Sequence, residues 1–375
     1  MSTTASAVGA QVLERVRGAL GDAGLDAVVA TSREALIYTA GAAPPSLRTV
    51  RQRLAASIVP ATGETEAVVV SVDAQLMRER MWADRVTAYV EFEQHPMQAA
   101  AAALQRAGLD GGRLGVELTA LSVEAHDVLR RSLPNAELVP VDELLAGLRV
   151  VKTPAEIDAI RRIGRAAEEI AARACRSVGA GDTERDLGNA ISEAFAAAGG
   201  DELTMLVVGA GERSSHPNAP PTSRTLQAGD VVRLDVIGTS GGYHCDVART
   251  AVVGEPREEV VRVYELLESV HERALEAVRP GVQSAEVYRI YRDAMEAAEL
   301  PPYHFVGHGL GITLHEEPFV HAQTSVPLEP GMVLCIEPLT MIEGEFGVQI
   351  EDELVVTDDG CELITRASGL LPIGT

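Results

Sequence analysis

Residues 229–250 read GDVVRLDVIGTSGGYHCDVART, and this stretch decides the fold. It predicts two apolar strands joined by a two-residue turn at Ser240-Gly241. Such a turn would place Asp235 directly opposite Asp246 on one face of the hairpin. Directly opposed residues on neighbouring strands have Cβ atoms roughly 4.5–5.5 Å apart. We therefore expect two carboxylates to face each other across this hairpin.

A second stretch repeats this design with different acids. Residues 331–356 read GMVLCIEPLTMIEGEFGVQIEDELVV, and a turn centred on Gly344 would place Glu337 opposite Glu351. Two carboxylates about 5 Å apart repel each other by about 3 kcal/mol at an effective dielectric constant of about 20. A fold accommodates two such pairs only when positive charge lies between them. The alternative, that these acids are ordinary solvated hairpin residues, is disfavoured because two pairs are in register.

The positive partner that fits these residues is metal. Carboxylate oxygens with one imidazole suit divalent ions, of which manganese is our first expectation and zinc, cobalt and iron are alternatives. His308, in the GHG motif between the two hairpins, can supply the nitrogen ligand. Four carboxylates balance two divalent cations in charge. Two ions about 3.5–4 Å apart can share a hydroxide nucleophile and polarise a carbonyl group, as in hydrolytic two-metal sites.

The composition excludes several classes of partner. The chain of 375 residues has 32 Lys and Arg against 55 Asp and Glu, and its net charge of −23 repels nucleic acid and anionic membranes. No basic segment with a following apolar stretch opens the sequence, and no apolar run approaches the roughly 18 residues of a membrane span. Four scattered cysteines without CxxC spacing predict buried thiols rather than disulfides. We therefore expect a cytoplasmic protein that binds neither nucleic acid nor membrane.

The length suggests two domains, with a boundary near residue 150. Residues 1–150 alternate helical and strand-like segments, which predicts a small α/β domain. Residues 151–375 combine helices with the acid-bearing antiparallel strands, which predicts an α+β domain. Thr153, Pro154 and Glu156 form a helix-starting capping box. Helices are expected at about 8–23, 154–178, 183–198, 256–278 and 284–299, and strands at 26–30, at 67–72 and from 115.

Several motifs together resemble one family of enzymes. GYHCDVART at 242–250 resembles the GYxSDxxRT strand of the pita-bread metallopeptidases, and HFVGHGLGITLHEEP at 304–318 resembles their HxxGHGxGxxxHExP segment. The sequence at the expected domain boundary, LRVVKTPAEIDAIRR, is similar to the opening of the catalytic domain in prolidase-type members. This family includes Xaa-Pro dipeptidase, aminopeptidase P, methionine aminopeptidase and creatinase. The resemblance implies a pita-bread catalytic domain preceded by a smaller, creatinase-like N-terminal α/β domain.

The resemblance also implies a role for each candidate ligand. Asp235 would bind one ion, and Asp246 and Glu351 would bridge both ions. His308 and Glu337 would bind the other ion. Glu337 would also take the proton of the metal-bridging hydroxide that attacks the carbonyl.

Two further histidines match the family pattern. His315, seven residues after His308, would stabilise the oxyanion that develops on the substrate. A satisfied structural histidine is the alternative. His304 fits the first position of the histidine motif, and a loop-stabilising role is equally compatible with it.

The chain departs from the family pattern where substrate is bound. Pro217-Asn218 stands where the family has a Pro-His pair, and His216 is a candidate to compensate. Phe319 stands where prolidases carry an arginine that recognises the dipeptide carboxylate, a contact that a phenyl ring cannot make. Gln349 replaces the arginine commonly found before the last glutamate ligand. We therefore take His216, Asn218, Phe319 and Gln349 as candidate substrate-binding residues.

These features predict a metal-dependent hydrolase that cleaves a peptide or amide C–N bond in a small substrate. The resemblance favours an Xaa-Pro peptidase of the aminopeptidase or dipeptidase type. The departures leave open an amidase or lyase of small metabolites on the same dinuclear site. A noncatalytic binding protein is a third possibility, disfavoured because all five ligand positions are kept. By resemblance alone, the chain is expected to form a homodimer.

Overall fold

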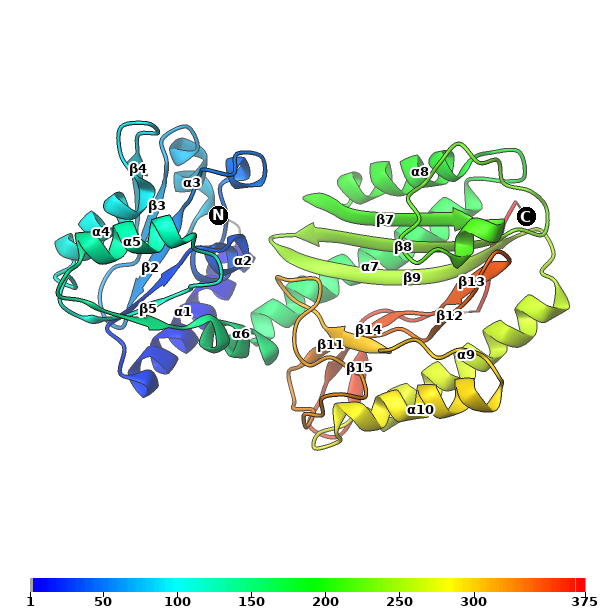
Figure 1. The fold of residues 1–375 in the computed structure, drawn as a ribbon. Helices are drawn as coiled ribbons and strands as arrows, with labels where there is room; N and C mark the ends of the chain where they lie inside the picture. The colour runs from blue at the N-terminus through cyan, green and yellow to red at the C-terminus, as the bar shows by residue number, and fades with distance from the viewer. Residues whose placement is uncertain (1–2, 368, 375) are drawn as a thin grey trace. The chain divides into compact units, whose positions relative to one another are not determined.

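The computed structural model describes residues 3–367 and 369–374. The chain divides into two compact units, Met1–Arg149 and Val150–Thr375 (Figure 1). The first unit is built on one six-stranded sheet flanked by helices, and the second combines helices with the other strands. This mixture of helices and sheets confirms the expected fold class.

Helices cover both faces of the sheet in the first unit. The strand order is β4-β3-β2-β1-β5-β6, with β2 antiparallel to both neighbours and the other pairs parallel. Along β3, Val68 and Val70 pack under α4 and α5, whereas Ala67 and Val69 pack under α2 and α3, because successive strand residues point to opposite faces. The elements are α1 (Thr3–Ala23), β1 (Ala27–Ala30), α2 (Arg33–Ala40), η1 (Pro45–Arg48), β2 (Ala56–Pro60), β3 (Glu66–Val70), α3 (Ala74–Arg80), β4 (Arg85–Tyr89), α4 (Pro96–Arg106), β5 (Arg113–Val116), α5 (Val123–Ser132), β6 (Glu137–Pro140) and α6 (Asp142–Val150).

The helices of the second unit begin where the sequence predicts. Thr153 caps α7 and forms a capping box with Glu156, and Thr183 does the same for α8 with Asp186. The described strands form sheets of the orders β16-β9-β8-β7, β10-β11-β14-β15 and β12-β13. The elements are α7 (Pro154–Arg176), α8 (Glu184–Ala197), β7 (Glu202–Ala210), η2 (Gly211–Ser215), β8 (Val231–Ser240), β9 (Tyr243–Val253), α9 (Glu258–Ala277), α10 (Ser284–Ala297), β10 (Gly307–Gly309), β11 (Val333–Ile336), β12 (Leu339–Ile342), β13 (Phe346–Gln349), β14 (Asp352–Val356), β15 (Cys361–Leu363) and β16 (Leu371–Ile373).

The register predicted for the first hairpin is wrong by two residues. The turn lies at Gly241-Gly242, not at Ser240-Gly241, so Asp246 is opposite Ile237 rather than Asp235. Both glycines have positive φ, 59° and 85°, a conformation that a serine adopts only with strain. Because the shift is an even number of residues, Asp235 and Asp246 still share one face and become diagonal neighbours.

The register predicted for the second hairpin is confirmed, but its ladder is interrupted. Ile336 pairs with Asp352, and Leu339 pairs with Gln349, which is the register set by a turn at Gly344. Glu337 and Glu351 fall between these two ladders, outside the paired strands. The expected acids are therefore opposite each other at a gap in the sheet.

Alternation separates the core of the second unit from its acids. Leu234 and Val236 of β8 and Cys245 of β9 pack into a core under α7 and α8. Asp235 and Asp246 consequently point to the opposite face, and Cys245 points away from Asp246 as expected. A second core joins α9 and α10 to the alternate residues of β11, β13 and β14. The two helix-backed layers of strands thus turn their polar faces toward each other (Figure 1).

Two further expectations concern cysteines and membranes. The four cysteines are free thiols within the described residues. Cys175, Cys245 and Cys335 are buried as predicted, whereas Cys361 is half-buried. In residues 3–367 and 369–374, no helix is both long enough and apolar enough to cross a bilayer.

Candidate metal centre

A cavity of about 290 Å³ opens between the polar faces of the two layers in the second unit. Its wall includes Asp235, Asp246, His308, Glu337 and Glu351, so the five candidate ligands meet in one place. They arrive from β8, from β9, from β10 and from the gap in the second hairpin. Apolar side chains complete much of the remaining wall, namely Met205, Ile237, Phe305, Leu314, Leu339 and Met341.

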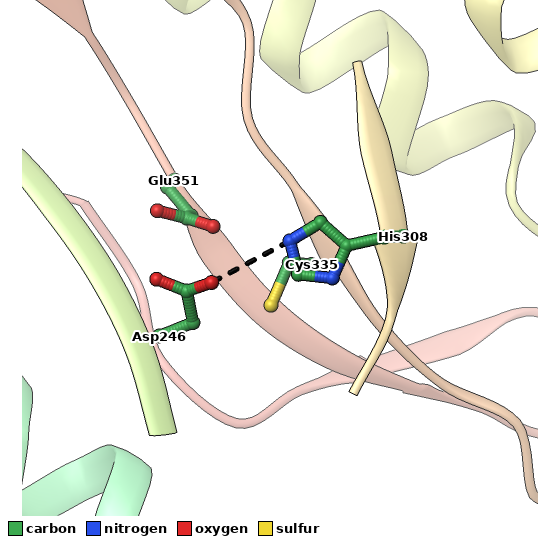
Figure 2. Close-up of side chains that lie close together, drawn as sticks. All are labelled: Asp246, His308, Cys335 and Glu351. Carbon is green, nitrogen blue, oxygen red and sulfur yellow. Dashed lines mark ion pairs between the residues drawn. The ribbon is translucent and has the colours of Figure 1, made fainter. Parts of the chain in front are cut away.

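The donor atoms in this cavity have the spacing of metal ligands. His308 Nε2 lies 3.4 Å from Asp246 Oδ2 and 3.3 Å from Glu337 Oε1. One donor atom from each of Asp246, His308, Cys335 and Glu351 lies within 4.8 Å of the others, and Figure 2 shows these groups pointing toward one another. Ligand bonds of about 2.0–2.3 Å place donors on opposite sides of an ion up to about 4.6 Å apart. The cluster therefore has the dimensions of an ion-binding site.

The orientation of His308 is fixed by the backbone of the next residue. Its Nδ1 lies 3.0 Å from the carbonyl oxygen of Gly309, and because a carbonyl only accepts, Nδ1 carries the proton. The other nitrogen, Nε2, is thereby directed at the acids. Burial lowers the pKa of His308, but the Glu337 carboxylate and then Glu351 outweigh it and raise the pKa above its ordinary value.

Burial and crowding make it costly for the acids to be ionised together. Burial raises the pKa of Asp235 to about 6, although the positive charge of Arg233 opposes the shift. Burial and then the neighbouring carboxylates raise the pKa of Asp246 and of Glu351 well above their ordinary values. The site thus favours the arrival of positive charge, whether as protons or as cations.

The residues present fit a divalent metal. Oδ1 of Asp235, Oδ1 of Asp246 and both carboxylate oxygens of Glu351 are buried without a hydrogen-bonding partner within the described residues. Burying unpaired carboxylate oxygens is costly unless a cation compensates them. Hard oxygen donors with one imidazole are the ligands that divalent ions such as manganese and zinc accept.

His315 lies over the imidazole of His308. The two rings stack at 3.8 Å between centroids, and Phe305 forms a T-shaped contact with His315 at 6.1 Å between centroids. Although the side chain opens to solvent, partial burial and then the charge of His308 lower the pKa of His315 to about 4. It is therefore a neutral imidazole at ordinary pH, in the cavity wall. His304 is exposed, stacks on Tyr303 at 4.6 Å and lies outside this described wall.

The structure divides the four candidate substrate-binding residues into two groups. Asn218 and Gln349 line the cavity. His216 is exposed and lines a neighbouring groove, which Asn218 shares. Phe319 is half-buried outside the cavity wall, and its ring is T-shaped to that of His315 with 6.0 Å between the ring centroids. Of the two candidates in this loop, Asn218 rather than His216 thus lines the cavity.

Three residues at the site had no role in the sequence-based interpretation. Arg233 lines the cavity, and Cys335 places its sulfur in the ligand cluster. Glu353 accepts a hydrogen bond from the backbone N–H of Asp246, and burial raises its pKa to about 8. Each lies two residues from a candidate ligand on an extended segment. The two-residue repeat of a strand is therefore the signal that could have found them.

Buried carboxylates, a directed imidazole and a neutral histidine around one cavity define the chemistry of a metal-dependent hydrolase. Two family models match the chain. Residues 158–358 match metallopeptidase family M24, and residues 13–151 match the creatinase/prolidase N-terminal domain.

Individual relatives are similar along nearly the whole chain. The probable dipeptidase PepE of Mycobacterium tuberculosis (strain ATCC 25618 / H37Rv) is 34% identical over 362 residues, which cover 94% of this chain and 92% of that protein. An Xaa-Pro dipeptidase of Lactobacillus helveticus is 31% identical over 297 residues, 78% of this chain and 80% of its own. Among solved structures, dipeptidase PepE from Mycobacterium ulcerans superposes with a TM-score of 0.82 at 31% identity, covering 99% of this chain and 100% of the other. A prolidase from Thermococcus sibiricus superposes with a TM-score of 0.84 at 27% identity, and the match covers 97% of this chain and 98% of the prolidase.

The chain belongs to metallopeptidase family M24 and carries a creatinase-like N-terminal domain. It is a metal-dependent hydrolase of peptide bonds, and membership of the family implies divalent metal ions. The resemblance and the fold expected from it are confirmed. The amidase or lyase alternative is not favoured.

Proposed function

We propose that this metallopeptidase is an Xaa-Pro peptidase, acting as a dipeptidase or as an aminopeptidase. The observation that carries the proposal is the convergence of five candidate ligands and His315 on one cavity. Relatives named Xaa-Pro dipeptidase and prolidase support the substrate class. The cavity volume of about 290 Å³ is just below the roughly 300–1,000 Å³ typical of ligand pockets, which favours short peptides.

In this proposal each side chain has a separate task. Asp235 would hold one ion, Asp246 and Glu351 would bridge two, and His308 and Glu337 would hold the second. When bound, divalent ions lower the pKa of water and polarise the scissile carbonyl group.

Two of the protein's own groups would handle protons and charge. Glu337 would accept the proton of the nucleophile and return it to the leaving amine. His315, a neutral imidazole with one N–H, would donate a hydrogen bond to the developing oxyanion. The stacking of His315 on His308 supports this, because it holds the donor beside the ligand cluster.

The proposed cofactor is a pair of divalent ions, with manganese first. The carboxylate oxygens support manganese. The Cys335 sulfur lies in the same cluster and is a softer donor, which supports zinc, cobalt or iron as the alternatives. Elemental analysis of the purified protein, followed by reconstitution of the metal-free protein with each ion, distinguishes these cases.

We also propose a homodimer in a reducing cytoplasm. The free thiols fit such a compartment. The homodimer is proposed from the resemblance to family members alone. Light scattering during gel filtration measures the mass, and the proposal requires twice the 39.7 kDa of one chain.

A substrate panel tests the proposed specificity. Metal-reconstituted protein is incubated with Xaa-Pro dipeptides, longer Xaa-Pro peptides, matched Xaa-Ala peptides and acyl-amino-acid amides. We expect cleavage of Xaa-Pro bonds in preference to Xaa-Ala bonds. Cleavage confined to the acyl-amino-acid amides would contradict the proposal. The ratio of dipeptide to longer-peptide turnover assigns the dipeptidase or aminopeptidase type.

A further inference from the structure

Arg233 is the largest side chain among those buried almost completely in the described protein. It is 1% exposed, lies on β8 two residues before Asp235, and lines the cavity. Arginine is almost never fully buried unless its charge and its donors are compensated. Burial lowers the pKa of Arg233, while the charges of Asp235, Glu351 and Glu337 raise it. Arginine in proteins keeps its charge, so the cavity carries a fixed cation of its own.

The guanidinium group joins two structural elements at the cavity. On one side, Nε donates to the carbonyl oxygen of Ser214 at 3.2 Å, and Nη2 donates to the carbonyl oxygens of His216, at 2.6 Å, and of Pro217. On the other side, Nη1 donates to Oε1 of Gln349 at 2.8 Å. One side chain therefore holds both the loop that precedes Asn218 and the last residue of β13.

The contact with Gln349 sets the direction of a hydrogen-bonded chain. A guanidinium group only donates, so the amide oxygen of Gln349 must face Arg233 and the amide nitrogen must face the other way. That nitrogen donates to Oε2 of Glu337 at 3.2 Å. The backbone of Gln349 is fixed separately, because its N–H donates to Thr250 Oγ1 and its carbonyl accepts from the same hydroxyl. Because Oε2 of Glu337 accepts from Gln349, Oε1 is the oxygen that faces the ligand cluster, 3.3 Å from Nε2 of His308.

Charge balance gives the cation a second effect. Two divalent ions would neutralise the four carboxylates of the cluster, and Arg233 adds one positive charge. That charge can compensate one further anion at the site, such as a hydroxide or a peptide carboxylate.

We propose that Arg233 is a positioning residue of the peptidase site, which orients Glu337 through Gln349 and fixes the loop that presents Asn218. The expected effect on kcat rests on the proposed function. The expected effect on metal affinity rests on the metal centre alone. It also accounts for Gln349, which stands where the family commonly has an arginine. In this chain the cation comes from β8 instead of β13, at nearly the same point in space, because the tips of residues 233 and 349 touch.

A charge-relocation experiment tests this assignment. The variants are Arg233→Met, Gln349→Arg and the double variant Arg233→Ala/Gln349→Arg, with Arg289→Met on the exposed face of α10 as the matched control. For each we measure kcat and KM on the best substrate of the panel, and the binding of Mn²⁺ and Zn²⁺ to metal-free protein by titration calorimetry. Circular dichroism and thermal unfolding verify the fold.

We expect Arg233→Met to lower kcat and metal affinity by roughly 10–100-fold, the usual cost of removing a group that orients a metal ligand. Gln349→Arg should also have a lower kcat and metal affinity, because it places two positively charged guanidinium groups in contact. The double variant should be more active than either single variant, because the longer arginine at 349 reaches the space vacated at 233.

Two outcomes overturn the proposal. One is Arg233→Met with kcat and metal affinity within twofold of the wild type. The other is a folded double variant no better than the single variants. If the wild type cleaves nothing in the panel, the proposed specificity fails, but the calorimetric comparison still decides the role of Arg233. If Arg233→Met does not fold, the double variant, which restores the cation, remains the deciding protein.

Discussion

The two strand pairs that carry the acids bring them to the cavity by different means. β8 and β9 pair without a break along their length, and Asp235 and Asp246 project from this continuous ladder. In the second layer, pairing stops after Ile336 and resumes at Leu339, and Glu337 and Glu351 lie at the gap.

The difference shows how a gap in a sheet can be used. At the gap, Glu337 and Glu351 are not paired with each other, and their backbone N–H groups bond to other segments. The N–H of Glu351 donates to the carbonyl oxygen of Ala248 on β9, and the N–H of Glu337 donates to that of Val306. Ala248 is the residue directly opposite Asp235. Alternation alone thus aims the first two acids. The bond to Val306 holds Glu337 within its own layer, next to β10, whereas the bond to Ala248 joins Glu351 to the opposite layer.

If both arrangements serve one metal centre, removing an acid from either pair should be equally damaging. We expect Asp246→Asn and Glu351→Gln each to lower kcat/KM by roughly 10³-fold or more, because each loses several kcal/mol of transition-state stabilisation. Steady-state kinetics after metal reconstitution measures the loss. Asp358→Asn, on an exposed turn, is the control. Full activity of either ligand variant would remove that strand pair from the site.

His315 belongs to neither ladder, and its loss should separate catalysis from metal binding. We expect His315→Ala to lower kcat by about 10²–10³-fold, the range for loss of one oxyanion donor, with little change in KM. The metal content should stay that of the wild type. His126→Ala in the first unit is the matched control. Loss of metal with an unchanged kcat per bound ion would assign His315 a structural role instead.

Both strand pairs contribute acids with raised pKa, so the metal-free protein should lose stability at high pH. The pKa of Asp235 is raised to about 6 and that of Glu353 to about 8, chiefly by burial. The folded state therefore holds more protons than the unfolded state above about pH 4, and this stabilisation is lost as pH rises through about 6 and 8. Urea unfolding of chelator-treated protein should give a lower free energy of unfolding at pH 8.5 than at pH 5, by about 1 kcal/mol or more. Higher stability at pH 8.5 would contradict the account.

The smallest effects should come from the turns of the two hairpins. Gly241 and Gly344 have φ of 59° and 77°, and a Cβ on either would meet no atom within 4 Å. Replacing each by alanine should cost about 1–2 kcal/mol of stability from backbone conformation alone. Chemical denaturation measures both. A turn at Ser240-Gly241 would instead leave Gly242 replaceable without cost, so Gly242→Ala tests the observed register.

The sequence predicted helix starts and strand register best where the local backbone conformation suits only a few residue types. The capping box at Thr153 set the start of α7, and Gly344 set the register of the second hairpin. The first register was misplaced because Ser240-Gly241 and Gly241-Gly242 are both short polar turns, and only the second satisfies two successive positive φ angles.

The environment of the ligands was harder to predict than the ligands themselves. The acids could be predicted from the sequence pattern. Strand alternation places them on one face, and their mutual repulsion requires a cation between them. Alternation along β8 places Arg233 on the same face as Asp235, but it does not give the partners of the guanidinium group, Gln349 and the loop after η2. These partners lie between 16 and 116 residues away along the chain, and no local pattern connects them to Arg233.

The central claim is that Asp235, Asp246, His308, Glu337 and Glu351 enclose two divalent ions. Anomalous X-ray diffraction from crystals grown with Mn²⁺, and separately with Zn²⁺, tests it most directly. The account predicts two anomalous peaks about 3.5–4 Å apart among these five side chains. A single peak elsewhere, or none between the two layers of strands, would contradict it.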